Sequence, residues 1–376
     1  MKVESCQIDA NALFCKELFD TAYSMISRIN SIQHIGLAVQ HMDAALKYYR
    51  KFFGMDIPFF DSVQAAPLMD VYTHGKTITK RASMIMNLQG GCAMEVLTPT
   101  SFKPSKSSTP MQLGDLHIFM VHFKTRDLNK HHKFAKSNGA IGVSDVQSNP
   151  AGTQVYDLQD EDGNWFRMEP TQDLYREMHH VSGGVAGCSI GVKNIDESLK
   201  LYRDIFGYDR VEFDQTGVFD DFKHLPAGEQ QYRRIRLKQS MQTGGGFGEL
   251  VGDSFIELVQ ALDREPNRTF KGRIWGDSGF VHLGLDVKGM KELGSKLTAA
   301  GHPFRCDSNE ALSMGQTKVH CTYIDDVDGT PIEMIEVYKV PIIEKWGLFL
   351  NVEKRDPLKP LPAFMLKAMR FSRIKD

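Results

Sequence analysis

The sequence has few cysteines, no long apolar run and almost no net charge. Its six cysteines lie far apart and include no Cys-x-x-Cys pair, so disulfide staples are not expected in a chain of 376 residues. No apolar stretch approaches the roughly 20 residues that span a bilayer, and charges interrupt the N-terminal segment, unlike a signal peptide. The net charge of −2 argues against a nucleic-acid-binding surface. These absences predict a cytoplasmic protein with reduced thiols.

The composition is that of a folded protein. Apolar residues make up 41% of the chain and charged residues 24%, which is too apolar for a disordered protein. The chain is longer than one ordinary hydrophobic core requires, so two domains are expected.

A short segment occurs twice in the chain. Residues 42–54, MDAALKYYRKFFG, and residues 195–207, IDESLKLYRDIFG, share seven of thirteen positions at an offset of 153. Each copy predicts an amphipathic helix that follows a strand and ends at a glycine. Two weaker copies begin at residues 114 and 278. The chain therefore contains four β-α-β-β-β modules, and we expect module 1 to pair with module 2 and module 3 with module 4.

Two motifs resemble those of a known superfamily. HIGLAV at residues 34–39 and DVDGTPIE at residues 326–333 resemble the opening and closing motifs of the vicinal oxygen chelate superfamily. This group includes glyoxalases, epimerases, bleomycin-resistance proteins and type I extradiol dioxygenases. The resemblance covers roughly residues 30–340. The four-module layout is similar to that of the extradiol dioxygenases and of 4-hydroxyphenylpyruvate dioxygenase.

The resemblance implies an α+β fold in which each pair of modules curls into a cup around a divalent metal. We expect one such domain over residues 31–175 and a second over residues 184–340. Residues 1–30 are expected to add an amphipathic helix. Residues 341–376 form a proline-punctuated tail that ends in a basic stretch, for which docking on its own domain or on the second subunit of a homodimer is favoured over an anionic partner or a membrane surface.

The candidate metal ligands lie in the first and last strands of the modules. Strand alternation places His34 on the same face as the small residues Gly36 and Ala38, as expected for a cup that holds a ligand. The superfamily positions, carried over to this sequence, are His34, Glu95 and His117 in the first domain and Glu257, His282 and Glu333 in the second.

The sequence departs from the superfamily pattern at two positions. The closing position of module 2 is Arg167, which does not ligate metals but is able to bind a substrate carboxylate or phosphate, or to pair with Glu169. The opening position of module 3 is Gly187, where the dioxygenase pattern has histidine. Either cup therefore remains a candidate for the metal. His74 and His224, at similar places in the two halves, are candidate general acids or bases.

Three functions are compatible with these residues. Two histidines and one carboxylate form the facial triad of non-haem Fe(II), which favours dioxygenase chemistry on a small aromatic or 2-oxo acid substrate chelated through vicinal oxygens. Zn, Mn, Ni or Co would instead support an isomerase, epimerase or lyase of the glyoxalase type. The third alternative is a metal-free binding protein of the resistance type. We expect one catalytic half and one structural half.

Overall fold

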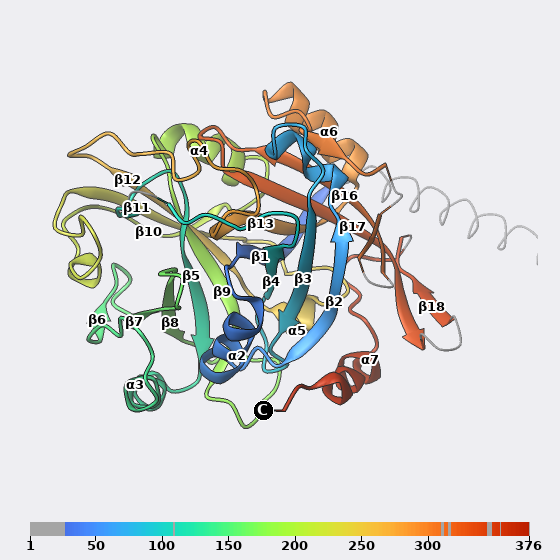
Figure 1. Ribbon diagram of the computed structural model, residues 1–376, viewed down its shortest axis with the longest axis horizontal. Coiled ribbons are helices and arrows are strands. Elements are labelled where there is room, and N and C mark those ends of the chain that lie inside the picture. The colour runs from blue at the N-terminus through green and yellow to red at the C-terminus, as the bar shows by residue number, and fades with distance from the viewer. Residues whose placement is uncertain are drawn as a thin grey trace, which may run out of the picture.

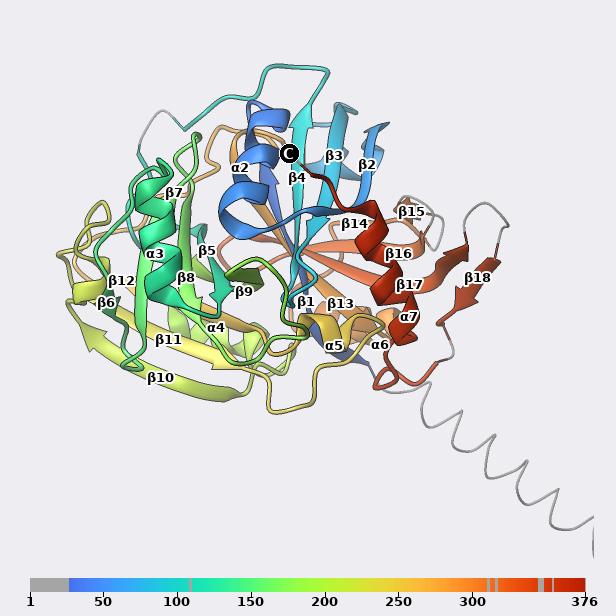
Figure 2. The ribbon, with the colours of Figure 1, turned by 90° about the horizontal axis from the view of Figure 1, so that it is seen from below.

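The protein folds into two strongly curved sheets. The computed structural model describes residues 27–107, 110–309, 312–314, 317–343, 348–353 and 355–375. Within these ranges, sheet A contains ten strands and sheet B contains eight. The two sheets lie on opposite sides of the molecule in both ribbon views (Figures 1 and 2). No helix of the described residues is long and apolar enough to cross a membrane. The predicted α+β fold is confirmed.

Each of the four modules has the predicted order of one strand, one helix and further strands. Module 1 comprises β1 (Arg28–Ala38), α2 (Met42–Phe53), β2 (Ile57–Ala65), β3 (Thr79–Met86) and β4 (Ala93–Pro99). Module 2 comprises β5 (His117–Thr125), α3 (Leu128–Ser137), β6 (Gln147–Ser148), β7 (Gln154–Gln159) and β8 (Trp165–Pro170). Module 3 comprises β9 (Ser182–Gly191), α4 (Ile195–Tyr202), β10 (Arg210–Gly217), β11 (Tyr232–Lys238), the short α5 (Gly248–Val251) and β12 (Phe255–Ala261).

Module 4 and the C-terminal tail complete the chain. Module 4 comprises β13 (Gly279–Lys288), α6 (Met290–Ala299), β14 (Cys306–Asp307), β15 (Leu312–Met314), β16 (Thr317–Asp325) and β17 (Pro331–Ile343). The tail contributes β18 (Leu348–Asn351) and α7 (Ala363–Ala368). The described residues also form the 3₁₀ turns η1 (Pro67–Tyr72), η2 (Asp220–Phe222) and η4 (Met369–Ser372).

The modules do not pair in the expected way. Sheet A has the strand order β14-β16-β17-β13-β1-β4-β3-β2, which joins module 4 to module 1. Sheet B has the order β10-β11-β12-β9-β5-β8-β7-β6, which joins module 3 to module 2. The expected pairing of consecutive modules is therefore wrong. The cause is the antiparallel contact between first strands, which forms between β1 and β13 and between β5 and β9.

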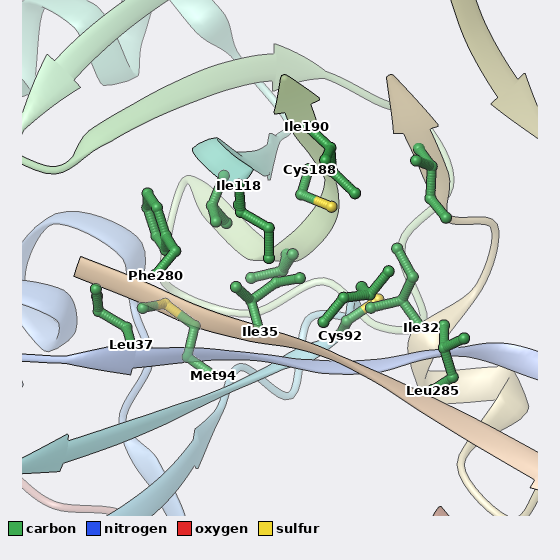
Figure 3. Packing of buried hydrophobic residues seen from close by; sticks show 14 of the residues in the cluster. Ile32, Ile35, Leu37, Cys92, Met94, Ile118, Cys188, Ile190, Phe280 and Leu285 are labelled. Carbon is green, nitrogen blue, oxygen red and sulfur yellow. The ribbon is translucent and has the colours of Figure 1, made fainter. Parts of the chain in front are cut away.

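The two sheets pack back to back around the main hydrophobic core. Figure 3 shows Ile35 and Met94 of sheet A facing Ile118 and Cys188 of sheet B. All four module helices contribute apolar side chains to the same core, as Phe53 of α2 does. Because the outer faces of the sheets are used for this packing, their concave faces remain available for a site.

The described part of the tail packs on sheet A. Leu361, Met365 and Leu366 are buried against residues of β3 and β4, and Figure 2 shows α7 beside β17. Ile374 donates its backbone N–H to the carbonyl oxygen of Asp56, over 3.0 Å. The helix expected over residues 1–30 lies almost wholly outside the described residues, and its last residues belong to β1 instead.

Candidate metal centre

Four inward-facing side chains meet at the middle of sheet A. They are His34 of β1, Glu95 of β4, His282 of β13 and Glu333 of β17. The four strands are neighbours in the order β17-β13-β1-β4. The register brings the residues level, because Gly36 pairs with both Glu95 and His282 while Gly284 pairs with both His34 and Glu333. Each central strand thus supplies one imidazole and each flanking strand one carboxylate.

The donor atoms of these side chains lie close to a common point. His34 Nε2 is 2.8 Å from His282 Nε2 and 3.0 Å from Glu333 Oε2. His282 Nε2 lies 3.3 Å from Glu333 Oε2 and 3.4 Å from Glu95 Oε2, and the His34–Glu95 separation is 3.9 Å. All four side chains are buried. Such a set of two imidazoles and two carboxylates is a typical donor set for a divalent transition metal.

Hydrogen bonding prepares the cluster for a cation. His34 Nδ1 lies 3.2 Å from Gln33 Oε1, an acceptor that fixes the proton on Nδ1 and leaves the Nε2 lone pair inside the cluster. Glu333 Oε2 is buried and has no hydrogen-bond partner among the described residues. A buried acceptor without a donor is costly unless a cation satisfies it. The residues therefore fit a metal ion.

Two glycines make room for the imidazole rings. A Cβ atom added to Gly36 would lie 2.3 Å from the His282 ring, and one added to Gly284 would lie 2.4 Å from the His34 ring. Both separations are far below van der Waals contact, and neither ring has free space to move because both histidines are fully buried. The small residues opposite the histidines are thus required by the geometry of the centre.

The Gly36→Ala variant is expected to bind a divalent ion at least about tenfold more weakly, because the new methyl group displaces His282 from the cluster. Chelator competition with the purified protein measures this affinity. Gly217→Ala is the matched control, since a Cβ atom at that position meets nothing within 4 Å. Equal affinities of the two variants would contradict the proposed geometry.

Lys80 is a neighbour of the centre that the sequence analysis missed. Its Nζ donates to Glu95 Oε1 over 2.9 Å and lies 4.8 Å from the centroid of the Trp275 ring. Burial alone would raise the pKa of Glu95, but Lys80 and His282 together hold it well below its usual range. Trp275 in turn stacks on His282, with ring centroids 6.5 Å apart. Strand alternation could have identified Lys80, because it shares the inward face of β3 with Ala82 and Met84.

His117 does not join the cluster. It begins β5, a strand of sheet B, in the left-handed backbone region with φ 122°. Its ring packs on Phe270 with centroids 4.8 Å apart, and burial lowers the pKa of His117 to about 3. The expected grouping of His34 and Glu95 with His117 is therefore wrong, because His282 takes that place from module 4.

At the corresponding positions of sheet B, buried ion pairs replace the candidate metal-binding cluster of sheet A. Glu257 occupies the position that corresponds to Glu95, but it accepts hydrogen bonds from Arg234 and Arg236 over 2.8–3.1 Å. Arg167 pairs with Asp157 over 2.7 Å and with Asp221 over 2.5 Å. Glu169, its expected partner, pairs with Arg236 instead. The structure thus does not bring Glu257 to His282 and Glu333.

The buried carboxylate of Glu257 is expected to make the stability of the protein depend on pH. Burial would raise the pKa of Glu257, but Arg234 and Arg236 lower it to about 2 from an ordinary value of 4.5. A pKa lowered by folding stabilises the native state above the unfolded pKa, and this contribution is lost as the pH falls from about 4.5 towards 2. Urea unfolding of the protein and of Glu257→Gln is expected to show a stability difference at pH 7 that shrinks below pH 4.5. A constant difference would contradict the assignment.

The remaining candidate residues lie away from the cluster. His74 is exposed in a turn with φ 55°. His224 Nε2 lies 2.9 Å from Asp157 Oδ2 in the ionic network of sheet B. A further group of possible ligands, Asp56 with His179 and His180, has Arg373 Nε 3.0 Å from Asp56 Oδ2. Because a guanidinium already neutralises that carboxylate, the cluster of sheet A is the stronger metal candidate.

A cavity of about 90 Å³ opens beside the cluster on the concave face of sheet A. Met84 and Ala93 line one wall, and Ile335 and Val337 line the opposite wall. Gln33, which orients His34, lies on the floor. Its lining is mainly apolar with a few polar groups, as is typical of small-molecule sites.

Comparisons with known proteins identify a matching family model and similar folds. Residues 31–168 match the model of the Glyoxalase/Bleomycin resistance protein/Dioxygenase superfamily. No curated protein sequence matches the chain. A candidate dioxygenase from Bacillus subtilis is 11% identical, with 93% of this chain and 97% of that chain covered and a TM-score of 0.55. Glyoxalase I from Zea mays is 13% identical, with 83% and 92% covered and a TM-score of 0.49. The Bacillus structure shows a shared fold.

Proposed function

We propose that this protein, whose residues 31–168 match the model of the Glyoxalase/Bleomycin resistance protein/Dioxygenase superfamily, is an enzyme with one divalent metal ion. The ion would be held by His34, Glu95, His282 and Glu333. The convergence of these four donor atoms is the observation that carries the proposal. When bound, the ion supplies Lewis-acid stabilisation of negative charge on two neighbouring oxygens of a small-molecule substrate.

The separations between donor atoms favour four protein ligands. In an octahedron with bonds of about 2.1 Å, adjacent ligands are about 3.0 Å apart and opposite ligands about 4.2 Å apart. The separations of 2.8–3.9 Å between the donor atoms of the four side chains fall near this range. All four side chains would therefore be able to hold one ion, which would supply Lewis-acid stabilisation to a substrate with vicinal oxygens.

This ligand set favours an isomerase or lyase of the glyoxalase type. The oxygenase triad has two histidines and one carboxylate and leaves three positions open, whereas sheet A supplies a second carboxylate. A carbon acid next to the chelated oxygens would lose its proton to a carboxylate of the centre, and we assign this role to Glu333. Its Oε1 accepts from Cys321 Sγ over 3.0 Å, which orients the carboxylate.

A dioxygenase is the second candidate, and Lys80 is the observation that favours it. Glu95 is ion-paired with Lys80 over 2.9 Å, and its Oε2 lies farther from both imidazoles than Glu333 Oε2 does. If this pair held Glu95 apart from the ion, His34, His282 and Glu333 would form the oxygenase triad with Fe(II).

Metal loading and two assays separate these functions. The protein, stripped and reloaded with Ni, Zn, Mn or anaerobic Fe(II), is tested on the hemithioacetal of methylglyoxal and glutathione, and for O₂ uptake with catechol. We expect about one ion per chain and isomerisation without O₂ uptake. O₂ uptake restricted to the Fe(II) form would support the second candidate. Protein that binds no ion would contradict both and leave the metal-free binding function.

We also propose a cytoplasmic location, as the sequence predicts. Cys92, Cys188, Cys306 and Cys321 are all free thiols. Free thiols are typical of a reducing compartment. Quantifying accessible and denatured thiols in protein purified under non-reducing conditions tests this assignment, because an oxidising compartment would leave disulfides among them.

A further inference from the structure

The cavity beside the metal centre continues along β13 to a polar end. Asp286 follows Gly284 by two residues on the inward face, so its side chain begins about 7 Å farther along the strand. Gly284 itself pairs with His34 and Glu333 of the centre. Asp286 pairs with Ser31 of β1, and both residues line the cavity. The four candidate ligands do not line the cavity themselves, but Gln33, whose Oε1 contacts His34, lines it together with Asp286.

Two hydrogen-bond acceptors lie together at this end. Asn30 contacts Asp286 through its side chain, and its own Oδ1 is buried without a hydrogen-bond partner among the described residues. The loop over them carries Gly245, whose φ is +83° and whose added Cβ would lie 1.9 Å from Asp286 Oδ2. Only glycine allows this approach, so the loop covers the acceptors and confines them to the cavity.

Arg28 and Lys288 act to lower the pKa of Asp286, but burial outweighs them. Lys288 Nζ is directed to the backbone oxygen of Glu353 and to Glu336, and Arg355 donates to the backbone oxygens of Lys359 and Pro360. Most of the other lining side chains are apolar, such as Met84, Val337 and Phe247, and polar groups such as Gln33, Thr317 and Asp356 also line the cavity. The cavity thus combines an apolar body with acceptors at the end remote from the metal centre.

We propose that Asp286 and Asn30 bind a hydroxyl group at the end of the substrate remote from its chelating oxygens. The substrate class is then a small molecule with vicinal oxygens at one end, an apolar body and a hydrogen-bond donor at the other end. This inference rests on the proposed function for the chelating end only. Burial raises the pKa of Asp286 to about 7. A neutral hydroxyl group can therefore bind to Asp286 without a full negative charge being buried next to it.

Ligand binding to the metal-stripped protein tests the donor end directly. N-phenyl-1-naphthylamine serves as a fluorescent probe of the cavity, and 4-ethylphenol and 4-ethylanisole compete for it. The two competitors share a body, but only the phenol donates a hydrogen bond. We expect the protein to bind the phenol about tenfold more tightly, as one hydrogen bond to a carboxylate provides.

Three variants locate the effect. Asp286→Leu is expected to reduce the phenol-to-ether affinity ratio to about one, and Asp286→Asn to retain part of it through its amide oxygen. Val337→Trp fills the cavity and is expected to weaken both competitors. An unchanged ratio in Asp286→Leu, or no displacement of the probe by either compound, would overturn the inference.

Metal content distinguishes this failure from failure of the proposed function. Asp286→Leu, once reloaded, is expected to bind as much metal as the unaltered protein, because Asp286 is not among the four ligands. A protein with no metal but an intact phenol preference would refute the proposed function alone. A protein with full metal content and no preference would refute the donor site alone.

Discussion

The His34→Ala and His282→Ala variants are expected to lose the bound metal and all metal-dependent activity. Each imidazole lies within 3.4 Å of at least two other donor atoms, so its removal opens the centre of the cluster. Loss of a direct ligand should exceed the 10- to 100-fold cost in affinity that is typical of supporting residues. Elemental analysis of protein dialysed without chelator measures the stoichiometry.

His117→Ala is the control for these variants. It removes the same imidazole from a buried position that the cluster does not include. We expect this variant to keep its metal. The opposite result, in which His117→Ala loses metal and His34→Ala keeps it, would transfer the site to another part of the fold.

The Arg167→Met variant is expected to lower the free energy of unfolding by about 3–5 kcal/mol. The guanidinium of Arg167 is fully buried between Asp157 and Asp221. Its removal leaves Asp157 with His224 and Asp221 with Arg234, so each buried carboxylate loses one of its ion-pair partners. Methionine keeps part of the aliphatic chain, and the loss reports the missing charge and hydrogen bonds together with the missing guanidinium volume. Urea unfolding at pH 7 provides the value.

Arg81→Met is the matched control on sheet A. Arg81 makes a similar fork to Asp61 and a contact to Asp43, but its partners are partly or largely exposed. Exposed pairs contribute at most about 1 kcal/mol. If both variants lost the same stability, burial of the sheet B network would not be the source of its effect.

The sequence was sufficient to predict the modules but not their partners. Alternation and helical periodicity determine which face of an element is apolar, and this was enough for the strand at residues 34–39 and the helix that follows it. The same pattern does not determine which strand pairs with this one. The modules present similar first strands, so β1 could pair with β5 or β13 without any change in its own pattern.

For the site, too, the sequence predicted the individual residues but not how they group. His34, Glu95, His282 and Glu333 were all candidates because each occupies a ligand position that the superfamily resemblance implies for its own module. Their grouping failed because it relied on the pairing of whole modules. Lys80 and Asp286 were missed, since a charged residue in an inward strand position is informative only once the cavity it faces is known.

The division of the centre between β1 and β13 has a consequence for how the protein is made. His34 and His282 are 248 positions apart, and the whole of sheet B is built from the intervening chain. Contacts of such high sequence separation are slow to form because loop closure must precede them. During synthesis, the amino-terminal half therefore emerges with only half of the ligands. A ribosome-bound chain that stops before β13 can neither assemble this centre nor use a metal ion to guide its early folding.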